Sequence, residues 1–209
     1  MLINIDLTLA QNYGRRWRIT MDYRLSTQEA RSHLAAYHHW LLKSRPAEAY
    51  AAASKYQQIV ERLNGGTNQG SYVHAQSAGS QIRDKLSAPE GRMPMWGQKG
   101  SFILQHQGIT ALVTSTNVPN QTCLFQISLQ AVQPYALFIS NTGYSSIIVS
   151  RFGWNLREAI CTEIDALLTN QGCVIDEDYC DVIQVPAWAA ETNFELRAYP
   201  ESTGQLRIV

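Results

Sequence analysis

Short apolar segments that alternate with polar residues and are separated by turn residues fill the chain from residue 101 to about residue 150. SFILQHQGITALVTST is typical of two strands around a turn at Gln107 and Gly108, and TCLFQISLQ is typical of a third. YALFISNTGYSSIIVSRF predicts a hairpin that turns at residues 141–143. Strands this short and this closely spaced favour an antiparallel meander over a parallel βαβ sheet.

Helical spacing of apolar residues predicts two helices in the first third of the chain and one after the strands. The first begins at Ser26, where STQE forms a capping box, and ends before Pro46, because proline disfavours helical geometry in the residue before it. The second begins at Pro46 and stops at the NGG of residues 64–66. The third is capped by Asn155 and ends at residues 170–172. Two or three short strands are expected in the tail, in VIQVPAW, NFELRAYP and GQLRIV.

The first 24 residues alternate apolar and polar side chains with a period of two, which predicts a β-hairpin that turns at AQNYG. In its return strand Trp17 lies on the apolar face, and Arg16, Arg18 and Arg24 share the polar face with Asp22. We interpret these arginines as a solvated strand face. A contact to phosphate or nucleic acid and a protein interface are the alternatives.

Residues 65–100 are rich in Gly, Ser, Asn and Gln, with one short helical candidate at residues 80–86. We expect a mobile or partner-ordered segment, in which Met93, Met95 and Trp96 are available to a partner. The chain then divides into a hairpin and two-helix unit (1–64), this segment (65–100) and a meander, helix and C-terminal strands (101–209), together one compact domain. The predicted fold class is α+β: an antiparallel sheet, made of the N-terminal hairpin and the central meander, packed with two N-terminal helices and one C-terminal helix.

Charged residues make up only 16% of the 209 residues, and 17 Lys and Arg balance 17 Asp and Glu. A chain without net charge has no overall field to steer it towards nucleic acid or an anionic membrane. The start has no basic region of the kind that precedes a signal peptide, and no apolar run is long enough to span a membrane. None of the four cysteines forms a CxxC pair. We therefore expect a cytoplasmic protein with free thiols, or a disulfide among the last three cysteines if the chain is exported.

The motifs of nucleotide binding, serine nucleophiles and zinc peptidases do not occur in the sequence, and we expect neither a metal site nor a cofactor. The acidic run DEDYCD lacks the spacing of a calcium loop and is interpreted as an exposed turn. His74, in the polar segment, and His106, beside the predicted turn, are the candidates for a general base.

The polar faces of the predicted central strands carry Gln, Ser and Thr rather than Lys and Glu, with Gln126 at the start of one strand. Such a face can be desolvated at lower cost than a charged one. The leading hypothesis is therefore a non-enzymatic protein that binds a protein partner or itself through this face and through Met95 and Trp96. A nucleic-acid-binding accessory protein that uses the segment from Arg15 to Arg24 is the first alternative. A metal-independent hydrolase or nuclease with a histidine base is the second.

Overall fold

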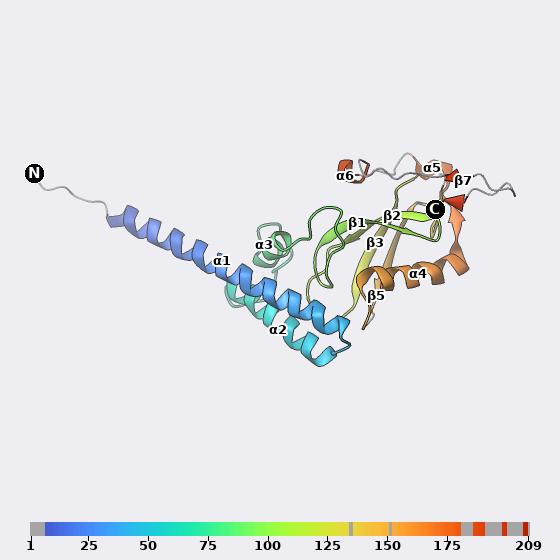
Figure 1. Cartoon of the computed structure of the whole chain (residues 1–209). Helices are drawn as coiled ribbons and strands as arrows, with labels where there is room; N and C mark the ends of the chain where they lie inside the picture. The colour runs from blue at the N-terminus through green and yellow to red at the C-terminus, as the bar shows by residue number, and fades with distance from the viewer. Residues whose placement is uncertain are drawn as a thin grey trace, which may run out of the picture.

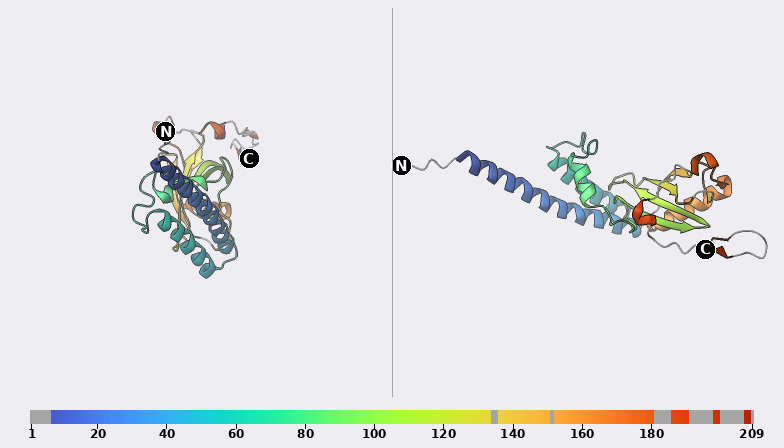
Figure 2. Two further views of the ribbon diagram at one scale, coloured as in Figure 1. Left: turned by 90° about the vertical axis from the view of Figure 1, so that its left-hand side faces the viewer. Right: turned by 90° about the horizontal axis from the view of Figure 1, so that it is seen from above.

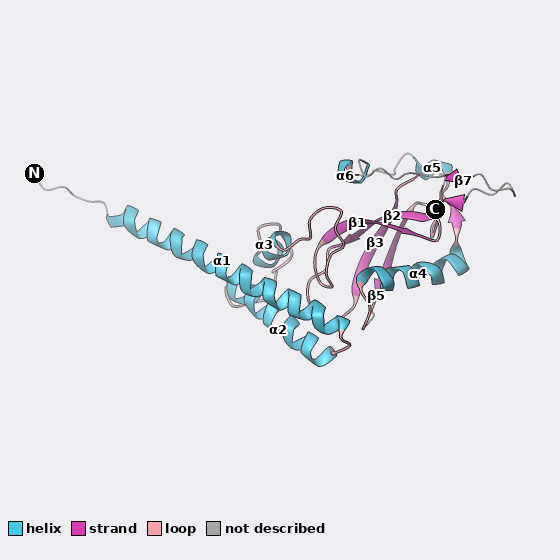
Figure 3. Cartoon of the chain, viewed as in Figure 1, coloured by secondary structure: helices cyan, strands magenta, loops and turns pink. Residues whose placement is uncertain are grey.

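A computed structural model describes residues 7–133, 136–150, 152–180, 186–190, 198–199 and 207–208, and for residues 7–22 the description is of the backbone (Figure 1). Three helices come first, then a sheet, then a helix that packs against the sheet: the helices are α1 (Leu7–Leu42), α2 (Pro46–Leu63), α3 (Ala78–Lys85) and α4 (Leu156–Gln171). This α+β order, with its antiparallel sheet, confirms the predicted fold class except for the N-terminal hairpin (Figure 3).

The predicted N-terminal hairpin is wrong, because residues 7–42 form the single helix α1. Ser26 therefore caps nothing: it lies inside α1 with its side chain buried. The alternation of period two was real, but this segment contains no proline and only four β-branched residues in 36, and most of the others are good helix formers. A pattern of alternating residues cannot outweigh that composition when one half of the helix also packs against a neighbour.

α1 and α2 form an antiparallel pair joined by a tight turn at Ser44, whose φ is 53°. The break before Pro46 and the stop after Leu63 confirm the predicted bounds of α2. Since an α-helix rises about 1.5 Å per residue, the 36 residues of α1 extend about 54 Å and the 18 residues of α2 about 27 Å. Figures 1 and 2 show α1 continuing well past α2 and α3 at its N-terminal end.

The sheet has the order β1-β2-β3-β5, with every pair antiparallel, and its strands are β1 (Gly100–His106), β2 (Ile109–Ser115), β3 (Phe125–Ala131) and β5 (Tyr144–Val149). The predicted turn at Gln107 and Gly108 is confirmed. Both residues have positive φ, 50° and 79°, the geometry of a type I′ turn that suits the twist of a two-residue hairpin.

The predicted hairpin that turns at residues 141–143 is wrong in its pairing. β5 pairs with β3, whereas β4 (Leu137–Phe138) pairs with β6 (Cys173–Val174) after α4. The Ser140 hydroxyl donates to the carbonyl of Tyr144 at 2.6 Å and turns the chain between β4 and β5. Local sequence places both strands, but the choice of partner depends on a segment about 35 residues away.

α4 begins as predicted. The Asn155 side chain accepts from the Glu158 amide, and the Glu158 carboxylate accepts from the Asn155 amide, each at 2.9 Å. The remaining elements are short: β6, α5 (Glu177–Cys180), α6 (Ala187–Ala190), β7 (Ala198–Tyr199) and β8 (Arg207–Ile208), of which the last two pair with each other. The end of the strand predicted at 182–188 lies in α6, and much of the predicted tail lies outside the described residues.

Two hydrophobic clusters hold the described part of the chain together. The larger joins one face of the sheet to α4 and to the adjoining ends of α1 and α2, and it includes Trp96. The smaller joins α1, α2 and α3 through Leu34, Tyr56 and Ile82. The confirmed helix α3 and the buried Trp96 both come from the segment 65–100, whose mobility stays a prediction.

Trp96 links its segment to the helices through His38. The Trp96 amide donates to His38 Nδ1 at 3.1 Å, so His38 must be neutral at that nitrogen. Burial, with a smaller effect of the neighbouring His39, lowers the pKa of His38 below its ordinary 6.5. The unfolded chain therefore takes up this proton at a higher pH than the folded chain does. The free energy of unfolding is expected to fall as the pH drops below about 6.5 and on through the folded pKa.

Urea unfolding measured from about pH 8 to about pH 5 tests this expectation. His38→Asn keeps an acceptor near the position of Nδ1 but does not titrate, so this variant should lose part of the pH dependence. An unchanged dependence in His38→Asn would contradict the assignment and point to the other histidines.

Candidate nucleic-acid interface

The balanced net charge hides a division of the chain into a positive and a negative part. Residues 1–85 carry eleven Lys and Arg against six Asp and Glu, and residues 86–209 carry six Lys and Arg against eleven Asp and Glu. The formal charges are therefore +5 and −5. Residues 100–150, which hold the four-stranded sheet, contain no charged residue. The positive charge thus belongs to the helical unit α1–α3.

Several cations of the helical unit face solvent without a carboxylate partner among the described residues. Arg62 pairs with Glu29 at 2.7 Å, and Arg45 pairs with Glu48. The exposed cations of α1–α3 for which the described residues show no ion pair are Arg24, Arg31, Lys43, Lys55 and Lys85. Sequence reasoning missed all but Arg24, although the uneven distribution of charge along the chain would have pointed to them.

The buried face of α3 packs closely against the loop before it and against the rest of the helical unit. Gly79 lies so close to the preceding loop that a Cβ there would sit 2.5 Å from the Ser71 carbonyl oxygen and 2.5 Å from the Tyr72 ring. The Ser80 amide also donates to the Ser71 carbonyl at 3.2 Å, and Ile82 is fully buried in the smaller cluster. One face of this eight-residue helix is therefore fixed, and the other faces solvent.

The charged end of α3 contacts α1 and the segment before β1. Lys85 Nζ lies 4.1 Å from the centre of the Tyr23 ring, a cation–π contact that joins α3 to the middle of α1. Asp84 accepts from Lys99 at 2.8 Å and lies 3.4 Å from Arg83. The hydrogen bond from Lys99 is the main reason why the pKa of Asp84 lies below its usual value. The one carboxylate of α3 is thus matched by nearby cations.

The predicted binding residues do not form one site. Arg24 is exposed on α1, and Arg16 and Arg18 belong to the first part of α1, whose side chains the structure does not describe. Trp96 is buried and its indole N–H donates to the Trp154 carbonyl at 2.8 Å. Met95 is half-buried against the smaller cluster.

Gln126, the remaining predicted binding residue, lies on the uncharged face of the sheet. Its side-chain amide donates to the Ser146 hydroxyl at 3.0 Å, and Ser101 and Thr114 share a hydrogen bond of 3.2 Å on the same face. Binding of a protein partner to this face stays a prediction.

The two candidate bases lie in different surroundings. His106, at the end of β1, contacts Asp165 of α4 with 2.6 Å between Nε2 and Oδ1. His74 is exposed in the loop before α3, and its carbonyl accepts from Ser77. The His106–Asp165 pair can orient an imidazole, but it also joins the sheet to α4, and catalysis by either histidine stays a prediction.

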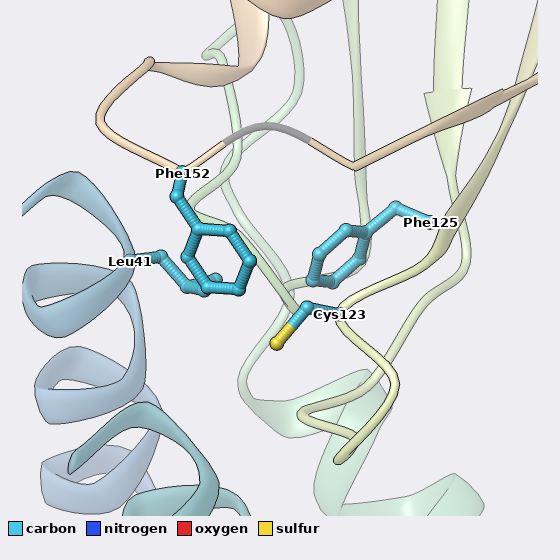
Figure 4. A pocket seen from close by; sticks show the side chains of 4 residues that line it. All are labelled: Leu41, Cys123, Phe125 and Phe152. Carbon is cyan, nitrogen blue, oxygen red and sulfur yellow. The ribbon is translucent and has the colours of Figure 1, made fainter. Parts of the chain in front are cut away.

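A small apolar hollow lies between α1 and the sheet, lined by Leu41, Cys123, Phe125 and Phe152 (Figure 4). It is too small to admit a water molecule, so it does not provide a small-molecule site. Within the described ranges, no three or more His, Cys, Asp or Glu side chains come together as a metal site would require. No helix in the described part of the chain combines the length and the apolar character needed to cross a membrane.

Parts of this chain are similar to known proteins. Residues 25–85 match the family described as the KlcB N-terminal DNA-binding domain. Two proteins named KlcB from Escherichia coli are similar to this chain: one is 33% identical over 106 residues and the other 29% identical over 161 residues. These alignments cover 51% and 75% of this chain but only 26% and 35% of the relatives. No solved structure matches. The helical unit made of the second part of α1, α2 and α3 is therefore the part of this chain that is similar to the KlcB N-terminal DNA-binding domain.

Proposed function

We propose that this protein binds double-stranded DNA through the helical unit α1–α3. The observation that carries the proposal is the match of residues 25–85 to a DNA-binding domain family. The match begins at Leu25 in α1 and ends at Lys85, the last residue of α3, so it contains most of the smaller hydrophobic cluster and, among the described residues, all the exposed unpaired cations of α1–α3 except Arg24, which directly precedes it. Nucleic-acid binding, the first alternative drawn from the sequence, thus replaces protein binding as the leading hypothesis.

The distribution of charge supports the proposal. DNA carries one phosphate charge per about 1.7 Å of its axis, so a protein face with net positive charge gains affinity by releasing counterions. The helical unit and the segment before it have a formal charge of +5, and the rest of the chain has −5. Such an asymmetric chain should approach DNA with its helices first and with the acidic part turned away.

The first part of α1 supplies a second group of cations. Arg15, Arg16 and Arg18 lie in α1 before the matched segment, about 9–14 Å along the helix axis from Arg24. An isolated helix of this length is only marginally stable in water, so it gains from contact with another molecule. Since residues 7–24 hold four arginines and one carboxylate, we assign DNA phosphates as the contacts of this first part of α1.

Fluorescence anisotropy with a labelled DNA duplex tests the function. The full chain should bind at low ionic strength, with an affinity that falls steeply between about 50 and 200 mM salt. Replacing Arg15, Arg16, Arg18 and Arg24 together by glutamine should weaken binding and reduce the slope of log K against log salt by about 3 to 4, because each lost phosphate contact accounts for about 0.9 of the slope.

Two controls separate charge from other effects. The same four positions changed to lysine should keep most of the slope, and Arg92→Gln, which removes an exposed cation outside the matched segment, should leave it unchanged. If the wild-type chain fails to bind any duplex at low salt, the proposed function is wrong. If it binds but the glutamine variant keeps the full slope, only the assignment of phosphate contacts to the first part of α1 is wrong.

A further inference from the structure

We propose that α3 reads the DNA sequence and that Gln81 is the residue that contacts a base edge. This inference rests on the proposed function, and it adds a role that is distinct from phosphate contact. Contacts to phosphates position a protein on the duplex, whereas contacts to base edges in a groove give sequence preference. The two roles call for different residues, and the helical unit offers both kinds.

The packing of α3 leaves one face for a ligand. Gly79, Ser80 and Ile82 are buried against α1, α2 and the preceding loop, whereas Gln81 and Lys85 are exposed. On a helix with 100° between residues, Gly79, Ser80 and Ile82 occupy an arc of about 160°, and Gln81 lies about 180° from the middle of that arc. An α-helix with its side chains is about 10–12 Å across, so α3 is narrow enough for the major groove, which is about 12 Å wide.

The surroundings of α3 permit an approach to DNA. Asp84 would repel phosphates, but Lys99 and Arg83 lie within ion-pair distance of it. Lys85 adds a positive charge at the end of the helix, where its contact with the Tyr23 ring fixes α3 beside the middle of α1. α3 therefore lies next to the part of α1 that carries the exposed Arg24, so phosphate contacts by α1 and groove contacts by α3 can be made together.

Gln81 has the chemistry and the orientation for this role. Its Nε2 donates to the carbonyl of Gln76 at 2.7 Å, which holds the side chain in one direction. The amide has a second N–H and a carbonyl oxygen, and this donor and acceptor pair is the one that glutamine uses for bidentate contact with adenine. A glutamine carries no charge, so it adds little to non-specific affinity and its effect should appear in sequence preference.

Selection from a random-sequence duplex DNA library with the full chain tests the inference. The wild-type chain is expected to enrich a consensus that contains an adenine whose identity depends on Gln81. Gln81→Ala should lose the preference at that position and bind the consensus about 5- to 150-fold more weakly, with no change in the salt slope. Gln58→Ala, the same change at an exposed glutamine of α2 in the matched segment, should alter neither quantity.

A second variant keeps the test independent of helix stability. Gln81→Glu keeps the length of the side chain but only accepts hydrogen bonds, so its preference should move from adenine towards cytosine at the same position. The inference is wrong if Gln81→Ala and wild type select the same consensus with the same affinity. It is also wrong if the wild-type chain binds duplex DNA but enriches no consensus, a result that would leave the proposed function intact. Failure to bind DNA at all would overturn the proposed function as well.

Discussion

Replacing Trp96 by alanine is expected to lower the free energy of unfolding by about 3–5 kcal/mol. The indole is 1% exposed, and its ring centre lies 4.7 Å from that of Phe125 in the larger cluster. Truncation leaves a large cavity, removes the aromatic contact and leaves the Trp154 carbonyl without its indole donor. Because Trp96 joins the segment after α3 to the sheet, its loss should weaken the contact between the helical unit and the sheet.

Urea unfolding followed by circular dichroism measures this effect through the shift of the midpoint. Met93→Ala is the matched control: Met93 lies three residues earlier and is 45% exposed, so its truncation should change stability by less than about 0.5 kcal/mol. Trp96→Phe should lie between the two, since it retains a ring but loses the indole N–H. Equal stability of the Trp96→Ala and Met93→Ala variants would mean that this segment does not pack as described.

The second large effect is expected at Gly79, where alanine should destabilise the protein by about 1–3 kcal/mol and also reduce DNA binding. The added Cβ would lie 2.5 Å from the Ser71 carbonyl oxygen. That atom belongs to the backbone and accepts from the Ser80 amide, so it cannot move without displacing α3. If α3 enters the groove of DNA, its displacement should weaken binding even at a temperature where the variant is folded.

Thermal unfolding and anisotropy with the same duplex distinguish the two consequences of Gly79→Ala. Gln81→Ala is the control for stability, because it changes the exposed face of the same helix and should leave the unfolding midpoint nearly unchanged. A Gly79→Ala variant with wild-type stability would contradict the tight packing at Ser71. Reduced stability with wild-type DNA binding would show instead that α3 does not contribute to the interface.

The sheet was predictable because its signals are local. Alternation of apolar residues sets the two faces of β1 and β3, and two residues with positive φ close the first hairpin. The caps of α4 and the break before Pro46 are local as well. The pairing of β4 with β6 was not predictable, because those strands are joined only after α4 has returned the chain.

The candidate site was less predictable than the fold. The net charge of zero argued against nucleic acid, but an average over 209 residues conceals a positive and a negative part. Arg24 was singled out on a predicted strand, and it lies instead on the helix α1. Gln81 carried no signal in the sequence, because only the buried positions of Gly79, Ser80 and Ile82 show which face of α3 remains exposed.

The sequence by itself determined where most elements of the sheet, α2 and α4 lie, and it separated a positive N-terminal part from a negative C-terminal part. Short-range hydrogen bonds, turn conformations and caps decide where these elements begin and end, and each acts within a few residues. The tertiary structure alone decided that α3 packs against α1 and α2 with one face exposed. The burial of Trp96 likewise depends on contacts between residues far apart in the chain. The physical reason is that an isolated helix or an isolated turn is marginal in water, and its final form depends on the apolar surface that it buries.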